Sequence, residues 1–228
     1  MRRLAVGLLS VILLGGCSSL DIRPSDSSPA PPGLAVYELK DNFCQGASGL
    51  LRFRQTARFT FRGRNASMFG MMELDPGSRR ARLVAVNELG IKLFDLEVAE
   101  EEVIEHFVIP ELSRFPRFGE AVATSLLRIF LAPCPMPGKD RVTFTGGRYL
   151  VSGKRGEGTV HFLFGESHAA MIEKSMTGRR ENWRVIYRDH RRFQNRFIPY
   201  DMVLIDKAAA YRLELKITDV RAGYEHID

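Results

Sequence analysis

Cysteine and histidine are scarce in this chain of 228 residues, which contains three cysteines and five histidines. No two cysteines have C-x-x-C spacing, and no histidines have the H-E-x-x-H spacing of a zinc-binding helix. The sequence also lacks a G-x-S-x-G nucleophile elbow, a P-loop and a dinucleotide-binding fingerprint. We therefore expect no metal site, no cofactor and no catalytic residues, and hence a binding protein rather than an enzyme.

The apolar run at the start of the chain is too short to cross a membrane. Residues 1–3 are positively charged, and residues 4–14 fall short of the ~20 residues that span a bilayer. The following Leu14, Gly15, Gly16 and Cys17 resemble the lipobox of bacterial lipoproteins, in which diacylglycerol is attached to the cysteine and a chain such as palmitate to the new amino terminus. We predict a lipoprotein signal peptide at 1–16 and lipidation of Cys17. The alternative is an ordinary secretory signal with a chance cysteine.

Residues 17–33 connect the predicted anchor to the rest of the chain. They are polar and rich in proline and serine, so we expect a disordered tether followed by one folded domain over 34–228. Ser18, not an aspartate, follows the cysteine, which in the enterobacterial sorting rule favours the outer membrane. We expect a protein anchored by lipid to the bacterial outer membrane and facing the periplasm, a location that excludes nucleic acid as a partner.

Beyond the tether, the hydrophobic pattern has a period of two, which is typical of strands with one buried face. In 51–64 most odd positions are aromatic or aliphatic and most even positions are arginine. Turn sequences separate several runs of this kind, at 75–78, 87–90, 146–147, 154–158 and 177–179. The intervals leave no room for crossover helices, so we predict about eleven antiparallel strands joined as a meander.

One segment breaks this strand pattern. It begins at Ser113, a residue type that caps helices, and it ends at Pro133. Apolar residues recur there at steps of three and four, namely Phe115, Phe118, Val122, Leu126 and Ile129. The spacing predicts a single helix that lies across the apolar face of the sheet, because its wide apolar stripe must be covered.

The predicted fold class is mainly β with α, a curved many-stranded antiparallel sheet covered by a helix. This order of meander, helix, Pro-rich loop and second meander after a lipobox is similar to the LolA/LolB family, as are the stretches 87–94, 188–200 and 211–217. The similarity covers about residues 50–221. It implies a half-barrel whose apolar cavity accepts acyl chains, and a role in lipid or lipoprotein transfer or in envelope assembly. The chain departs from the family at 34–49, where we expect a short helix instead of a clear amphipathic one.

The apolar positions of the strands and the helix predict which residues would line such a cavity. They are rich in phenylalanine and methionine, which repack around flexible ligands. The candidates are Phe59, Phe61, Met68, Met72, Phe94, Leu96, Phe130, Phe162 and Phe164. The same residues could instead fill a packed core without a cavity.

The arginines of 51–64 are a second candidate site, consisting of Arg52, Arg54, Arg58, Arg62 and Arg64. Aligned guanidinium groups can bind phosphates of lipid headgroups or an acidic protein surface through paired hydrogen bonds. The alternative is a solvated outer face that discourages pairing between sheets. If this face binds a partner, the protein is a structural or assembly lipoprotein that holds an envelope protein or polysaccharide and has no lipid ligand.

The two cysteines after Cys17 form a candidate disulfide. Cys44 and Cys134 are an even pair in a protein expected to reside in the oxidising periplasm. Two separate thiols are the alternative.

Overall fold

The structure is a computed structural model that describes residues 29–39, 49–99, 102–194 and 196–223. The predicted signal peptide, Cys17, most of the tether and Cys44 lie outside these ranges. No helix in the described ranges is long and apolar enough to cross a membrane.

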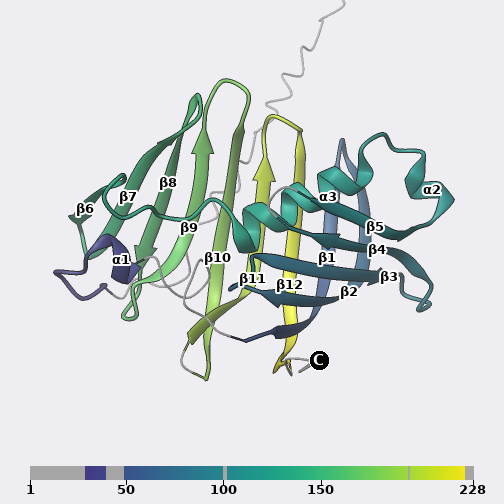
Figure 1. The fold of residues 1–228 in the computed structure, drawn as a ribbon, viewed down its shortest axis with the longest axis horizontal. Helices are drawn as coiled ribbons and strands as arrows, with labels where there is room; N and C mark the ends of the chain where they lie inside the picture. The colour runs from purple at the N-terminus through teal and green to yellow at the C-terminus, as the bar shows by residue number, and fades with distance from the viewer. Residues whose placement is uncertain (1–28, 40–48, 100–101, 195, 224–228) are drawn as a thin grey trace, which may run out of the picture.

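Twelve strands of the described ranges form one antiparallel sheet (Figure 1). They are β1 (Leu51–Phe61), β2 (Arg64–Asp75), β3 (Arg80–Val86), β4 (Lys92–Val98), β5 (Val103–Val108), β6 (Arg141–Thr145), β7 (Arg148–Arg155), β8 (Gly158–Gly165), β9 (Ala170–Thr177), β10 (Asn182–Phe193), β11 (Arg196–Asp206) and β12 (Tyr211–Ala222). The expected meander of antiparallel neighbours is confirmed, with twelve strands where we predicted about eleven.

The strand order places the two ends of the folded chain at the middle of the sheet. The order is β5-β4-β3-β2-β1-β12-β11-β10-β9-β8-β7-β6. The central pair, β1 and β12, is antiparallel and runs from Leu51 opposite Ala222 to Phe61 opposite Tyr211. The middle of the chain therefore supplies both edges, β5 and β6. The segment that joins these edges must cross the whole sheet.

That crossing segment contains the helical part of the fold. Its elements are α2 (Pro110–Ser113), α3 (Phe118–Leu126) and the π-helical η1 (Leu127–Leu131). The helix predicted to begin at Ser113 is wrong at its start, because Ser113 ends α2 and α3 begins five residues later. Pro116 explains the break, since a proline disfavours helical geometry in the residue before it. Arg117, which precedes α3, has a positive φ of 62°.

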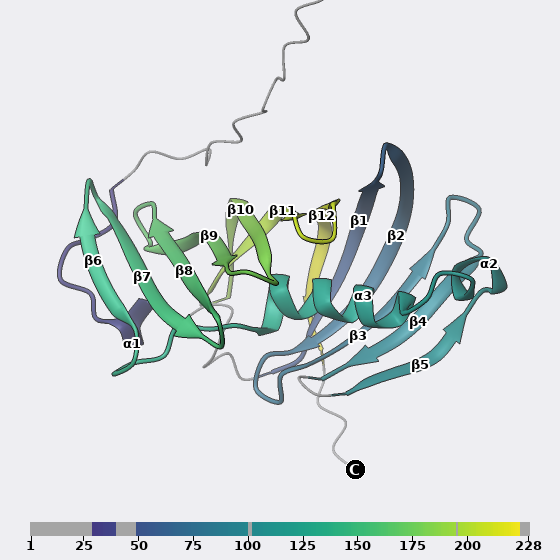
Figure 2. The ribbon, with the colours of Figure 1, turned by 90° about the horizontal axis from the view of Figure 1, so that it is seen from above.

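The helix lies on the concave side of the sheet, as the two views show (Figures 1 and 2). The ring of Phe118 in α3 meets Phe94 of β4 edge-on at 5.4 Å, and Phe130 of η1 stacks on Phe53 of β1 at 6.2 Å. The sheet is curved and not closed, so the predicted α+β fold class is confirmed. A short helix ahead of the first strand, α1 (Val36–Leu39), is also present.

Candidate ligand-binding faces

Six of the nine predicted cavity residues are packed in the core on the concave side. Each is at most 2% exposed, and all belong to one hydrophobic cluster that extends over both halves of the sheet. They come from distant strands and from the helix, and they are Met72, Phe94, Leu96, Phe130, Phe162 and Phe164. The structure thus brings them into one core, and their contact with a ligand stays a prediction.

The other three, Phe59, Phe61 and Met68, are only half-buried. Phe61 lies opposite Tyr211 and Phe59 opposite Leu213 in the β1–β12 pairing. The ring of Phe59 is 5.5 Å from Tyr211 and 6.3 Å from Phe61, measured between centroids. We call these five side chains the apolar mouth. Sequence reasoning missed Tyr211 and Leu213, although alternation of apolar residues continues through 211–217.

The apolar mouth adjoins the covering helix. The hydroxyl groups of Ser125 in α3 and Tyr211 share a hydrogen bond of 2.8 Å. Burial raises the pKa of Tyr211, so this phenol stays neutral near pH 7. The Tyr187 hydroxyl donates to the Ile129 carbonyl at 2.7 Å, which satisfies one backbone acceptor of the π-helical turn. The C-terminal half of the helical segment is thereby held to the sheet by polar contacts.

The five predicted arginines are exposed, but they do not share one face. Arg52, Arg54 and Arg58 lie on the outer face of β1, Arg62 lies in the turn that follows it, and Arg64 begins β2 opposite the inward-facing Phe61. Arg52 pairs with Glu73 of β2 through Nε at 2.8 Å, and Arg58 lies opposite Glu214 of β12. The Arg62 guanidinium lies over the Phe61 ring at 5.0 Å. The stripe is therefore spread along β1, the turn after it and the start of β2, and the structure does not gather all five around one point.

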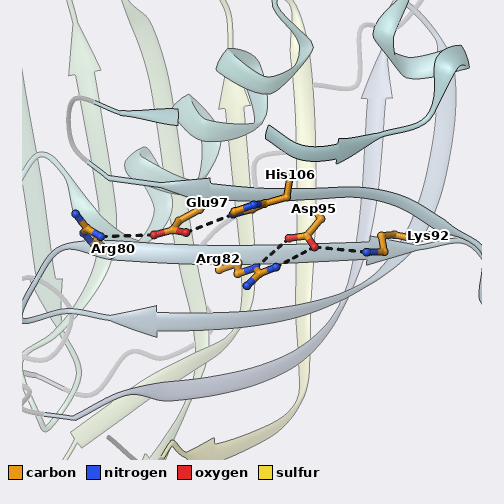
Figure 3. A network of polar contacts seen from close by, with 6 residues as sticks. All are labelled: Arg80, Arg82, Lys92, Asp95, Glu97 and His106. Atoms are coloured by element: carbon orange, nitrogen blue, oxygen red, sulfur yellow. Dashed lines mark hydrogen bonds and ion pairs between the residues drawn. The ribbon is translucent and has the colours of Figure 1, made fainter. Parts of the chain in front are cut away.

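A polar network continues this outer face across β3, β4 and β5 (Figure 3). Arg82 donates to both carboxylate oxygens of Asp95, at 3.0 and 3.1 Å. The hydrogen bond from Arg82 outweighs burial and holds the pKa of Asp95 below its ordinary value. Further contacts complete the network, among Arg80, Lys92, Asp95, Glu97 and His106. These ion pairs neutralise acidic side chains on an otherwise basic face.

Lys174 and Cys134, near the Pro-rich end of the helical segment, each contact backbone carbonyl groups. Lys174 is buried and donates to the carbonyls of Ala132 and Pro133 at 3.5 Å. Cys134 Sγ lies 3.2 Å from the Leu131 carbonyl, and its predicted partner Cys44 lies outside the described residues. Among the described residues, no group of three or more His, Cys, Asp or Glu side chains is placed to hold a metal ion.

The fold of this chain is similar to that of a solved structure. The LolA superfamily protein NE2245 from Nitrosomonas europaea has a TM-score of 0.54 at 8% identity, over 84% of this chain and 95% of that chain. A domain from Vibrio parahaemolyticus named for outer membrane lipoprotein sorting and a DUF1329 family protein from Desulfovibrio piger match at 10% and 8% identity. Both have a TM-score of 0.45 and cover 78% of this chain and 88% of theirs.

No family model and no curated protein sequence matches the chain. The structural likeness shows that the chain has the LolA/LolB-like fold predicted from its sequence.

Proposed function

We propose that this protein is a membrane-anchored periplasmic lipoprotein that binds an acyl chain of a lipid or of another lipoprotein. It acts in lipid or lipoprotein transfer or in envelope assembly, and it is not an enzyme. The apolar mouth carries the proposal, because it leaves aromatic and methionine side chains half-exposed beside a continuous hydrophobic core. The LolA/LolB-like fold supports it, since the resemblance implies that acyl chains bind on the concave side.

The physical reason is the cost of exposed apolar surface in water. Each square ångström of such surface that a ligand covers stabilises the complex by about 25 cal/mol. Phe59 and Tyr211 form a tilted ring pair, and Met68 adjoins the core on the neighbouring strand. Methionine adapts its shape to a flexible chain, so the mouth suits an acyl tail better than a rigid ligand.

The covering helix limits how far an acyl chain could enter the concave side of the sheet. Its C-terminal half is hydrogen-bonded to the sheet, whereas its N-terminal half contacts β4 through the Phe118 ring. We propose that the acyl chain of the ligand enters at the apolar mouth and reaches the core by displacing the N-terminal half of α3. The buried Phe94 would then become part of the ligand-binding surface, as predicted from the sequence.

The predicted lipid anchor at Cys17 is part of the same proposal. Lipidation at Cys17, with several acyl chains that each contribute ~0.8 kcal/mol per buried CH₂, would hold the protein stably at a membrane leaflet. Ser18 favours the outer membrane, and the tether over 17–33 would let the domain reach a partner that delivers or receives lipid. The expected partners are the membrane, acyl chains and other envelope proteins.

Native mass spectrometry on a soluble form that starts at Ser18, expressed in the periplasm, tests the proposal. We expect co-purified lipid near one per protein, and saturable binding of a fluorescent fatty acid after the lipid is removed. Phe59→Asp should weaken fatty-acid binding at least tenfold, because the charge must be desolvated when the chain binds. A clean mass without lipid, together with no fatty-acid binding, would refute acyl-chain binding.

Phe69→Asp is the matched control. Phe69 is a phenylalanine of the neighbouring strand β2, but it is 47% exposed and lies on the outer face of the sheet. Its replacement should leave fatty-acid binding within twofold of the unchanged protein. Equal losses in both variants would mean that the probe binds nonspecifically to apolar surface.

A further inference from the structure

A groove of about 430 Å³ lies on the outer face of the sheet, opposite the side that holds α3. Residues of β12, β1, β2 and β3 line it. Four of them are arginines, Arg52, Arg54, Arg82 and Arg221. Only two belong to the stripe recognised in the sequence, because the others come from different strands.

The four guanidinium groups differ in how many hydrogen bonds they donate to neighbouring carboxylates. Arg82 uses two nitrogens on Asp95. Arg52 and Arg221 each use Nε on one neighbouring carboxylate at 2.8 Å. In the described part of the chain Arg54 makes no side-chain ion pair or hydrogen bond. Its guanidinium is therefore available for paired hydrogen bonds to an incoming anion.

A β-bulge in β12 lies directly beside Arg54. Asp219 is opposite Arg54 and Ile217 is opposite Gln55, so Thr218 is the additional residue. The Thr218 hydroxyl donates to the Arg54 carbonyl at 3.1 Å. A bulge bends its strand and increases the local twist. The bulge thus accounts for a hollow at this position on a sheet face that is otherwise convex.

One wall of the groove is apolar. Met71 of β2 is 52% exposed, and it lies opposite Arg54 on one side and Val84 of β3 on the other. Both Met71 and Val84 line the groove. An occupant that covers Met71 would remove apolar surface from water, so the groove favours a ligand with an apolar group close to its negative charge.

The charged residues that line the groove limit which class of ligand it can bind. Four arginines face two carboxylates, Glu73 and Asp219, so the lining is positive but mixed. Those carboxylates repel a densely charged polyanion, and a flat bilayer surface cannot enter a hollow in the sheet. A protruding chain segment with separated carboxylates meets both conditions.

We propose that this groove binds an acidic segment of a partner protein, with a carboxylate on Arg54 and an adjacent apolar side chain on Met71. The two proposed sites lie on opposite faces of the sheet. Peptide binding in the groove therefore does not depend on acyl-chain binding at the apolar mouth, and either proposal can fail alone.

The test measures binding of fluorescein-labelled peptides to the mature lipoprotein, purified in a neutral detergent, by fluorescence anisotropy. Each peptide carries one leucine between two aspartates, at a spacing of one or two residues. Asparagine versions of the same peptides report the contribution of charge. Short-chain phosphatidylglycerol, below its micelle concentration, competes as a lipid headgroup.

Arg54→Gln should lower peptide affinity at least tenfold, and Met71→Gln about threefold to fivefold. Arg58→Gln is the matched control, because it removes the same charge from the same face of β1 outside the groove; it should change affinity less than twofold. Affinity should also fall as salt is raised, since the contact is between exposed charges. Phe59→Asp should leave peptide binding intact.

Three outcomes would overturn the proposal. In the first, no aspartate peptide binds more tightly than its asparagine version. In the second, Arg54→Gln and Arg58→Gln weaken binding equally, which would indicate diffuse attraction to a basic face. In the third, Arg54→Gln weakens the binding of phosphatidylglycerol but not that of the peptides, which would assign the groove to a lipid headgroup.

Discussion

Asp140 and Arg155 form a buried charge pair in which both carboxylate oxygens of Asp140 accept hydrogen bonds. The Asp140 side chain is 0% exposed, and it accepts hydrogen bonds from both Nη atoms of Arg155 at 2.8 and 2.7 Å and from the Met136 amide at 2.7 Å. Burial raises the pKa of Asp140, but these hydrogen bonds and the charge of Arg155 outweigh it, so the pKa lies below its ordinary value. The carboxylate therefore stabilises the fold above the ordinary pKa, and this contribution is lost as pH falls through the lowered one.

Replacing Asp140 with asparagine should lower the free energy of unfolding by about 3 kcal/mol at pH 7, because Arg155 would keep its charge without an anionic partner. The difference from the unchanged protein should shrink below about pH 4, where protonated aspartic acid resembles asparagine. Urea unfolding at pH 7 and pH 3 measures both effects. Glu120→Gln, which breaks an exposed pair with Arg117, should leave stability nearly unchanged. If Asp140→Asn changed stability as little as Glu120→Gln, or by the same amount at pH 7 and pH 3, the ionised Asp140 would not stabilise the fold as predicted.

Alternation predicts the face of a residue but not its neighbours on other strands. The odd and even positions of 51–61 do separate inward from outward side chains, and Tyr211 follows the same rule on β12, but Arg64 lies opposite the inward-facing Phe61. The grouping of Arg54 with Arg82 and Arg221 depends instead on strand register and on the bulge at Thr218. Register is a property of pairs of strands, so the groove cannot be predicted from the sequence of a single strand.

At the scale of elements, α3 shows where helical periodicity succeeds and where it fails. The three- and four-residue steps correctly predict a helix with an apolar face over 118–126. They extend too far toward the N-terminus, because Phe115 fits the period although Pro116 interrupts the backbone. They also do not distinguish the π-helical η1 from a regular helix, since both bury the same kind of residue.

The two halves of this helical segment should respond differently to mutation. Phe118→Ala removes the edge-on contact with Phe94, and it should cost about 2 kcal/mol, less than the roughly 3–5 kcal/mol for a fully buried phenylalanine. Hydrogen exchange should accelerate over 118–122, while 127–131 stays protected through the bond from Tyr187 to Ile129. Phe115→Ala is the control, because Phe115 is 60% exposed. Equal acceleration along the whole segment would show that it moves as one rigid unit.

At the scale of the whole molecule, the short intervals between strands predict that sequence neighbours pair, and they do. The pairing of β1 with β12 is not visible in any local pattern, because it joins strands from opposite ends of the folded chain. This pairing explains why the connection from β5 to β6 crosses the concave side. The position of α3 over the sheet is therefore a consequence of topology as well as of its apolar stripe.

The same topology predicts that residues 34–228 unfold as one cooperative unit. One hydrophobic cluster spans both halves of the sheet, and β1 with β12 joins them. Trp183, the single tryptophan, is 2% exposed on β10 and reports on one half through its fluorescence. Hydrogen exchange of β3 reports on the other half. In urea, both probes should give the same midpoint, as a two-state transition requires.

A charge placed in the central pair should move both midpoints together. Leu215 is 3% exposed between Ala57 of β1 and Met202 of β11, so Leu215→Lys buries an uncompensated charge and should cost several kcal/mol. Ala222→Lys, at the exposed end of the same strand, is the matched control and should leave both midpoints in place. If Leu215→Lys separated the Trp183 and β3 transitions, each half-sheet would be stable without the other. The sheet would then consist of two folding units, and not of the single domain predicted from the sequence.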